Sequence, residues 1–129
     1  MHVEKYLKRF RPRKEGENIW FSIGKTKLKG VLKEMKSMGV KRISFITGVD
    51  TGKDIEVIYH LIHKNKTINV RVSVDKKKPE VETITDIYPG ANLFERELAE
   101  MLGVKVKGHP NLKNLFLDKD SPKAPYRKS

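Results

Sequence analysis

Apolar and polar positions of this 129-residue chain follow two different periods, and each period predicts a different kind of element. Between residues 25 and 38 the apolar side chains recur at every third or fourth position, which is typical of a helix with one buried face. These side chains are Leu28, Val31, Leu32, Met35 and Met38. Lysines occupy the opposite face and Gly39 follows the pattern. We therefore expect an amphipathic helix over residues 25–38 that ends at Gly39.

The next part of the chain has the period of two that is typical of strands. Apolar and polar residues alternate over residues 43–49, 55–61 and 68–74, as they do in strands that bury one face. Asp50-Thr51-Gly52 and Asn65-Lys66 provide short turns between these segments. The sequence therefore predicts an α+β fold of two layers, in which the amphipathic helix covers a three-stranded antiparallel meander.

A second helix is expected after the Pro89-Gly90 break. Asn92 can act as its N-cap, with Glu95 answering as the second member of a capping box. Gly103 stands where a left-handed C-cap would fall. The apolar residues between these ends share one face: Phe94, Leu98, Met101 and Leu102. On the exposed side, Arg96 and Glu100 are one turn apart and can form an ion pair.

The remaining segments show weaker patterns. Residues 1–24 have little periodicity and predict a basic N-terminal arm, anchored by Tyr6 and Phe10, that precedes a core domain at residues 25–103. We expect a charged loop at residues 76–79 and a short helix at residues 81–87. Residues 104–129 predict an extended segment with no long element. Burying each leucine of this segment, or Phe116, would contribute about 1.5–3 kcal/mol of favourable transfer free energy. We therefore expect the chain's own core or another protein to cover these side chains.

Composition limits the kinds of chemistry available to the chain. Lys and Arg total 28 against 16 Asp and Glu, which gives a formal net charge of +12 and favours an acidic partner. Cysteine is absent, which excludes disulfides, thiolate zinc sites and iron–sulfur clusters held by this chain. No apolar run approaches the roughly 20 residues that would span a bilayer, so we expect a cytoplasmic protein.

Simpler structural roles compete with chemistry at the candidate site residues. Glu95, Glu97 and Glu100 could serve acid–base chemistry, but capping and surface pairing account for Glu95 and Glu100 and leave Glu97 least explained. The favoured role for His109 is a turn residue whose ring hydrogen-bonds to backbone. Basic residues also raise the possibility of nucleic-acid binding. Against it, Phe45 is expected on the apolar strand face, so no exposed aromatic platform is predicted.

One long segment resembles a known family. The run from Tyr88 to Leu112, YPGANLFERELAEMLGVKVKGHPNL, closely resembles the signature of the 30-kDa subunit of respiratory NADH dehydrogenase, as does Pro125-Tyr-Arg-Lys near the end. The residues that stand in register with the signature are Glu95, Arg96, Glu97, Gly103, Gly108, His109, Pro110 and Leu112. Tyr88 stands where the signature usually has tryptophan. A chain this short and free of cysteine looks like the version found as a separate small subunit of archaeal membrane-bound energy-converting nickel–iron hydrogenases and related ferredoxin-linked complexes.

The resemblance implies a role without cofactors, catalytic residues or metal ligands in this chain. It implies two protein partners: a large subunit holding the nickel–iron or quinone site, and a small iron–sulfur subunit. Residues after Leu102 would wrap the neighbour and form a docking segment. The residues expected at the partner interface are Glu95, Arg96, Glu97, Gly108, His109, Pro110, Leu112, Phe116 and Arg127.

The expected function is therefore that of a non-catalytic structural subunit. It would brace the large catalytic subunit in the cytoplasmic peripheral arm of a membrane-associated, ion-translocating oxidoreductase of the membrane-bound hydrogenase or ferredoxin-linked kind. Contact with the membrane would be through the complex alone, and no nucleic acid is expected as a partner. Two alternatives remain open: the 30-kDa-type subunit of a respiratory NADH or quinone dehydrogenase, and a free-standing basic nucleic-acid-binding module.

Overall fold

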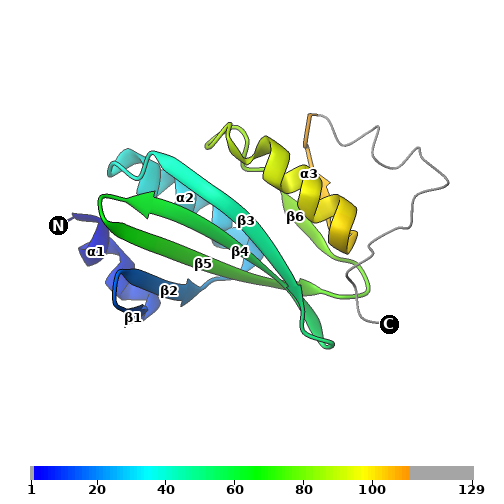
Figure 1. Ribbon diagram of the computed structural model, residues 1–129, viewed down its shortest axis with the longest axis horizontal. Helices are drawn as coiled ribbons and strands as arrows, with labels where there is room; N and C mark the ends of the chain where they lie inside the picture. The colour runs from blue at the N-terminus through cyan, green and yellow to red at the C-terminus, as the bar shows by residue number, and fades with distance from the viewer. Residues whose placement is uncertain (1, 111–129) are drawn as a thin grey trace.

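A computed structural model describes residues 2–110 and shows an α+β fold built on a mixed five-stranded sheet (Figure 1). The strands of this sheet lie in the order β1-β2-β5-β4-β3, and a separate pair joins β6 to β7. The elements in chain order are α1 (His2–Leu7), η1 (Lys8–Phe10), β1 (Arg13–Glu15), β2 (Asn18–Ser22), η2 (Lys25–Lys27), α2 (Leu28–Ser37), β3 (Arg42–Asp50), β4 (Asp54–His63), β5 (Lys66–Asp75), β6 (Glu80–Glu82), α3 (Ala91–Leu102) and β7 (Lys105–Lys107).

The expected meander is present, but it makes up only part of the sheet. Strands β3, β4 and β5 pair antiparallel in sequence order. Strand β2 then pairs parallel with β5, and β1 pairs antiparallel with β2. The sheet therefore has five strands and not the three that were predicted. The segment at residues 1–24 that was expected to be an arm supplies two strands and α1, because Ile19 and Phe21 bury one face of β2 against the core.

Helix α2 covers one face of the sheet, as its apolar stripe predicted. Leu28, Val31, Leu32 and Met35 are buried in the core, and Figure 1 shows the helix behind the long strands. The helix is shorter than residues 25–38, because its first turn is the 3-10 segment η2. Two aromatic residues of the N-terminal segment, Tyr6 and Phe10, pack against the same core.

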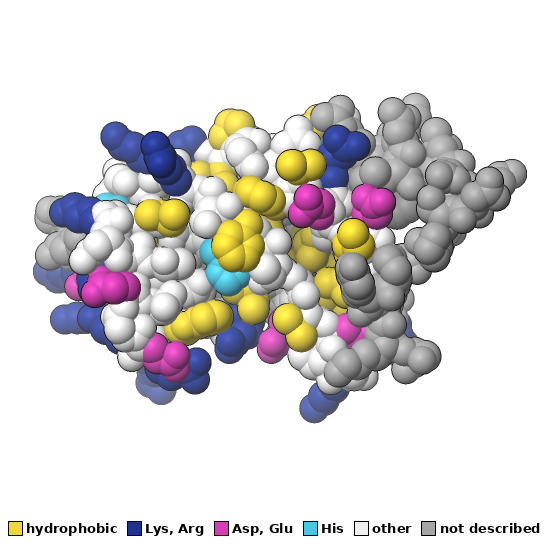
Figure 2. All heavy atoms as spheres, viewed as in Figure 1, with side chains coloured by type: hydrophobic (Ala, Val, Ile, Leu, Met, Phe, Trp, Pro, Cys, Tyr) yellow, Lys and Arg dark blue, Asp and Glu magenta, His cyan; other side chains and the backbone are white. Residues whose placement is uncertain are grey.

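The opposite face of the sheet is the open face, and no helix within residues 2–110 covers it. Figure 2 views the molecule from this side and shows hydrophobic side chains across the middle beside a histidine, with Lys and Arg mainly around the margins. A bulge in β3 between Ile43 and Phe45 changes which side chains reach this face. Phe45 was expected on the apolar, buried side, but it lies opposite His60 and is 43% exposed.

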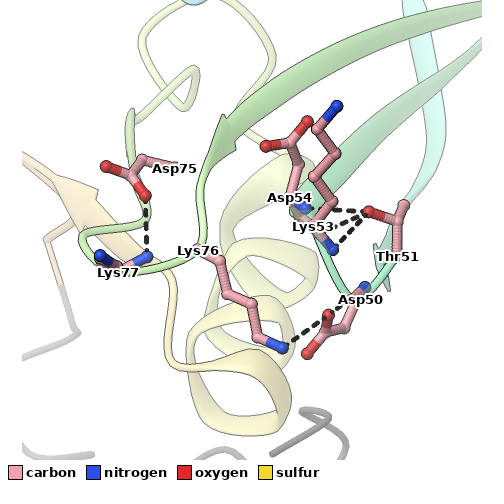
Figure 3. A network of polar contacts seen from close by, with 8 residues as sticks. Asp50, Thr51, Lys53, Asp54, Asp75, Lys76 and Lys77 are labelled. Atoms are coloured by element: carbon pink, nitrogen blue, oxygen red, sulfur yellow. Dashed lines mark hydrogen bonds and ion pairs between the residues drawn. The ribbon is translucent and has the colours of Figure 1, made fainter.

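The β3–β4 turn and the charged loop after β5 meet at one end of the sheet, as Figure 3 shows. The Asp50 carboxylate accepts a hydrogen bond from the Gly52 backbone N–H at 2.8 Å, and Gly52 has a φ of +89° that favours glycine. Lys76 Nζ lies 3.4 Å from the same carboxylate, which is buried. The expected turn and charged loop are thus confirmed, and an ion pair joins them.

The segment at residues 81–87 is not the short helix that was expected. Glu80–Glu82 forms β6, which pairs parallel with β7, and a turn follows. Val81 and Val106 lie opposite each other in this pair and are both buried. The partner strand comes from about 25 residues further along the chain, so local periodicity carried no sign of the pairing.

Helix α3 lies against β3 and ends as expected, but it begins differently. Gly90 occupies the N-cap position with no side-chain cap, so the predicted capping box of Asn92 and Glu95 is wrong. At the other end Gly103 adopts a φ of +69°, and its N–H donates to the Ala99 carbonyl. Leu98 and Leu102 are buried toward β3, where Gly48 leaves room for them.

Candidate docking site

Glu95 is the buried centre of the predicted signature. Its side chain is fully enclosed, with 0% of its surface exposed. The Thr83 hydroxyl donates to Oε1 at 2.6 Å, and the Ile84 backbone N–H donates to Oε2 at 2.8 Å. Both donors follow β6, so the carboxylate ties α3 to the segment that precedes it. Glu95 therefore fixes the position of α3 from inside the fold, and its expected place at the partner interface stays a prediction.

His109 closes the same buried cluster from the C-terminal side. Its ring is also 0% exposed, and Nε2 lies 2.9 Å from the Asn92 carbonyl oxygen and 3.9 Å from Glu95 Oε1. Because a carbonyl oxygen only accepts, Nε2 carries the hydrogen and donates it. The ring thus bonds to backbone, which confirms the favoured interpretation of this histidine. It fixes the chain that leaves β7 to the first turn of α3.

Gly108 and Pro110 are exposed on either side of this anchored histidine. Gly108 has a φ of +83°, and a Cβ at this position would lie 3.3 Å from Thr83 Cγ2. A side chain there would be both strained and crowded. Glycine is therefore the residue that suits this position beside the Glu95–His109 cluster. Three other expected interface residues, Leu112, Phe116 and Arg127, lie outside the described residues.

Burial controls the electrostatics of the cluster. Desolvation raises the pKa of the Glu95 carboxyl, while hydrogen bonds from Thr83 and Ile84 and the nearby His109 oppose that rise. Tyr59 is fully buried, and burial followed by the Glu95 charge raises the pKa of its hydroxyl. Its oxygen has no hydrogen-bond partner within the described part of the chain. Hydrogen bonds from Thr83 and Ile84 offset part of the cost of burying the Glu95 carboxylate.

Because the pKa of Glu95 is raised in the folded state, stability should decrease as pH rises. The folded state binds the Glu95 proton more tightly than the unfolded state, so this contribution to stability is complete below the unfolded pKa of about 4.3 and is lost as pH rises through the folded pKa. The Glu95→Gln variant lacks this loss. We expect the free energy of unfolding of the wild type to fall relative to that of Glu95→Gln as pH rises from about 4 to 7. Urea unfolding at stepped pH tests it, and parallel profiles would contradict it.

The exposed side of α3 carries the other predicted signature residues. Glu97 and Glu100 are exposed, and Arg96 is half-buried. The expected Arg96–Glu100 ion pair does not form, and the buried Nε of Arg96 has no hydrogen-bond partner among residues 2–110. Leu93 is 57% exposed on the same helix. Sequence reasoning missed Leu93, although its position outside the buried stripe of α3 was the available signal.

We call this surface the α3 docking face: Leu93, Arg96, Glu97 and Glu100, with Gly108 and Pro110 beside the buried His109. His109 links the two signature motifs, because its ring reaches the Asn92 carbonyl and the Glu95 carboxylate of α3. Glu95 and His109 form its support from below. Within residues 2–110, no group of three or more His, Cys, Asp or Glu side chains is placed to hold a metal ion.

Comparison with known proteins identifies the family. The family model described as "Respiratory-chain NADH dehydrogenase, 30 Kd subunit" matches residues 21–129 of the chain. The chain belongs to this 30-kDa subunit family. The match begins within β2 and includes the meander, α3 and both signature motifs, so the resemblance noted in the sequence is confirmed and the chain is a complex I 30-kDa-type subunit of an oxidoreductase complex.

Curated members of the 30-kDa subunit family are longer than this chain to different degrees. The C subunit of the NADH-quinone oxidoreductase of Moorella thermoacetica is 39% identical over 101 residues, which cover 75% of this chain and 67% of the relative. The C subunit from Ruegeria pomeroyi is 39% identical over 88 residues, or 44% of its length. The composite C/D subunit from Phocaeicola vulgatus is 38% identical over 87 residues, and these cover only 17% of its length.

Two solved structures share the fold of this 30-kDa family member. A trypsin-resistant fragment of Nqo5 (1-134) superposes with a TM-score of 0.76 at 28% identity, covering 87% of this chain and 100% of the fragment. A chain of the membrane-bound sulfane sulfur reductase, an archaeal respiratory membrane complex, gives a TM-score of 0.79 at 24% identity over 97% of this chain and 79% of that chain. Of the helices within residues 2–110, none is long and apolar enough to span a membrane.

Proposed function

We propose that this chain is a non-catalytic structural subunit that braces the large catalytic subunit in the cytoplasmic peripheral arm of a membrane-associated, ion-translocating oxidoreductase. The assembly would be a membrane-bound nickel–iron hydrogenase or a related ferredoxin-linked complex, with a small iron–sulfur subunit nearby. The observation that carries the proposal is the family match over residues 21–129. A respiratory NADH or quinone dehydrogenase fits the same observation and is the alternative.

Relatives with composite names support a large neighbour for this chain. The C/D proteins of Phocaeicola vulgatus and Photorhabdus laumondii contain the matching segment as 17% and 13% of their length. Their names join a C part and a D part in one chain. A covalent link between two subunits suits partners that pack side by side, because it raises their effective concentration. We therefore assign the large partner to the counterpart of the D part of these composite proteins.

The α3 docking face supplies the groups for this contact. Arg96 has a buried Nε without an acceptor within the described residues, and an unsatisfied buried donor costs about 1–3 kcal/mol. The buried Nε itself is closed to a partner, but the terminal nitrogens of this half-buried side chain are not among the buried atoms, and a carbonyl or carboxylate on the partner can accept from their N–H groups. Leu93 offers an exposed apolar side chain one turn from Glu97, and Arg side chains with buried donors are typical centres of binding energy at interfaces.

Co-purification tests the proposed role of Arg96. The full-length chain, tagged and expressed with its complex, is compared with Arg96→Ala. We expect recovery of the large subunit to fall by at least about tenfold, since truncating a buried charged donor at an interface costs about 2–5 kcal/mol. The thermal midpoint of the isolated chain should not fall, because no intramolecular bond to Nε is lost.

Lys33→Ala is the matched control for Arg96→Ala, because it removes an exposed cation from α2 on the helical layer. Its recovery of the large subunit should equal that of the wild type. Equal recovery with Arg96→Ala would remove this residue from the docking role. The identity of the recovered large subunit separates the two classes of complex: bound nickel with paired Cys-x-x-Cys motifs indicates a hydrogenase, and their absence indicates a quinone-reducing relative.

A further inference from the structure

A single row of side chains crosses the open face of the sheet. Backbone pairing places Trp20 on β2 opposite Asn69 on β5, Asn69 opposite His60 on β4, and His60 opposite Phe45 on β3. The Phe45 and His60 rings stack at 4.5 Å between centroids, and Trp20 meets His60 edge-on at 6.4 Å. The Arg71 guanidinium lies 5.5 Å from the centre of the Trp20 ring. Three strands thus present aromatic rings in one line.

Hydrogen bonds beneath these rings fix the row in place. His60 bonds to the Thr47 hydroxyl at 2.9 Å through Nε2 and to the Asn69 side-chain oxygen at 2.6 Å through Nδ1. The Asn69 amide nitrogen donates to the Ile19 carbonyl at 3.2 Å. The ring that Phe45 stacks on therefore has both nitrogens occupied. A surface whose side chains are already ordered loses less conformational entropy when it binds a partner.

Apolar exposure continues along the edge strand β3 and its neighbour β4. Phe45, Val49 and Ile62 are 43%, 46% and 41% exposed. All three alternate onto the open face by their strand pairing. Isolated exposed apolar residues are common, but a group gathered beside ordered aromatic rings on one face is typical of a binding surface. Trp, Phe and Arg together are also the composition found at the centres of protein interfaces.

The charge on this face differs from the charge of the whole chain. By strand alternation the open face carries Arg13, Arg42, Arg71, Glu15, Asp54, Glu56 and Asp75. Two of the arginines are paired within the face, Arg13 with Glu15 at 2.8 Å and Arg71 with Glu56 at 3.8 Å. Three basic and four acidic side chains leave almost no net charge, whereas the chain carries +12. A surface for nucleic acid or anionic lipid would concentrate the positive charge instead.

We infer that the open face is a second protein-docking surface, separate from the α3 docking face, and that its occupant is another subunit of the same assembly with an apolar, nearly uncharged surface. This inference rests on the proposed function, because it requires the chain to work within a complex. A nearly uncharged face with ordered aromatic rings at its centre is complementary to a partner surface that is also apolar and nearly uncharged. The large positive charge elsewhere on the chain lies mainly around the margins of this face in Figure 2, away from its aromatic centre.

The area of the open face is adequate for a stable contact. Strands β3, β4 and β5 have 9, 10 and 10 residues and β2 has 5, which at a strand spacing of about 4.8 Å and about 3.3 Å per residue gives roughly 540 Å². Standard interfaces bury about 800 Å² on each partner. A partner that covers the strands and reaches a little beyond their edge would meet this value. Burying the exposed parts of Phe45, Val49 and Ile62 would then supply an apolar centre for the interface.

Photo-crosslinking in the intact complex tests the inference. The photoreactive amino acid p-benzoylphenylalanine replaces Ile62 in one version of the tagged chain, Val49 in a second and Lys33 on α2 in a control. We expect the first two versions to give a covalent adduct with another subunit, at a yield at least about tenfold above the control. Absence of the adduct in a complex that is otherwise fully recovered would overturn the second docking surface alone.

Other products have equally clear meanings. An adduct with a second copy of this chain, or with nucleic acid, would overturn the assignment of the occupant. Recovery of the tagged chain without any other subunit would overturn the proposed function as well. As a second measurement, Val49→Lys combined with Ile62→Lys should reduce co-purification at least about tenfold, while Lys33→Glu leaves it unchanged. Unchanged recovery of the complex with the double variant would also refute the inference.

Discussion

Replacing Glu95 by alanine is expected to lower the free energy of unfolding by about 3–5 kcal/mol, the cost typical of removing one partner from a buried charged cluster. The buried Ile84 backbone N–H and the part-buried Thr83 hydroxyl would lose their acceptor. His109 would lose the carboxylate that lies 3.9 Å from its ring. The alanine would also leave a cavity under α3. Urea unfolding at pH 7 measures the loss.

Glu97→Ala is the natural control, because it removes the same side chain two positions away on the exposed side of α3. Its effect on stability should stay within about 0.5 kcal/mol. Glu95→Gln should fall between the two, since an amide keeps one acceptor for Ile84 and the Thr83 hydroxyl can turn to accept. Equal stabilities of Glu95→Ala and Glu97→Ala would show that the buried cluster does not hold α3.

Glu95 and Glu97 have different roles within the predicted signature: Glu95 is buried and supports α3, whereas Glu97 is exposed. Glu95 and His109 were expected at the partner interface, and because their side chains are enclosed we expect them to affect a partner by positioning neighbouring residues. Arg96 and Glu97 have atoms available for contact. A loss of assembly in Glu95→Ala should therefore accompany a loss of stability, whereas a loss in Arg96→Ala should not.

Elements with local patterns were predictable from the sequence. Helix α2 and strands β3 to β5 each bury one face along a continuous segment, so periods of 3.6 and 2 were visible. Strand β2 was missed because it is five residues long and pairs with β5, about 50 residues later. Parallel pairing leaves no turn between neighbours to mark it.

The site was less predictable than the fold, for two physical reasons. Phe45 reaches the open face because one extra residue in β3 shifts the alternation, and a strict period of two cannot locate such a bulge. Glu95 resembled the second member of a capping box because it lies three positions after Asn92. The donors that bury it come from Thr83 and Ile84, and only the packing of α3 beside β6 brings them there.

The close contact between α3 and β3 gives the second large prediction. A Cβ on Gly48 would lie 2.3 Å from Leu102 Cδ1 and 2.6 Å from Leu98 Cδ1. Gly48→Val should therefore push α3 off the sheet and cost about 1–3 kcal/mol or more, as overpacking does in a filled core. Gly30→Ala is the control, because nothing lies within 4 Å of a Cβ there, and it should stabilise α2 by about 0.5–1 kcal/mol.

A double-mutant cycle makes this prediction specific to the α3–β3 contact. Leu102→Ala alone should cost about 2–5 kcal/mol by leaving a cavity, and Gly48→Ala alone should cost about 1–3 kcal/mol by crowding. Combined, the new methyl group enters the space that Leu102 vacates, so the double variant should be more stable than the two losses predict by about 0.5–3 kcal/mol. Additive losses in urea unfolding would contradict the contact.

Because α3 carries Arg96, Gly48→Val should also weaken recovery of the large subunit, and relief of crowding by Leu102→Ala should restore part of it.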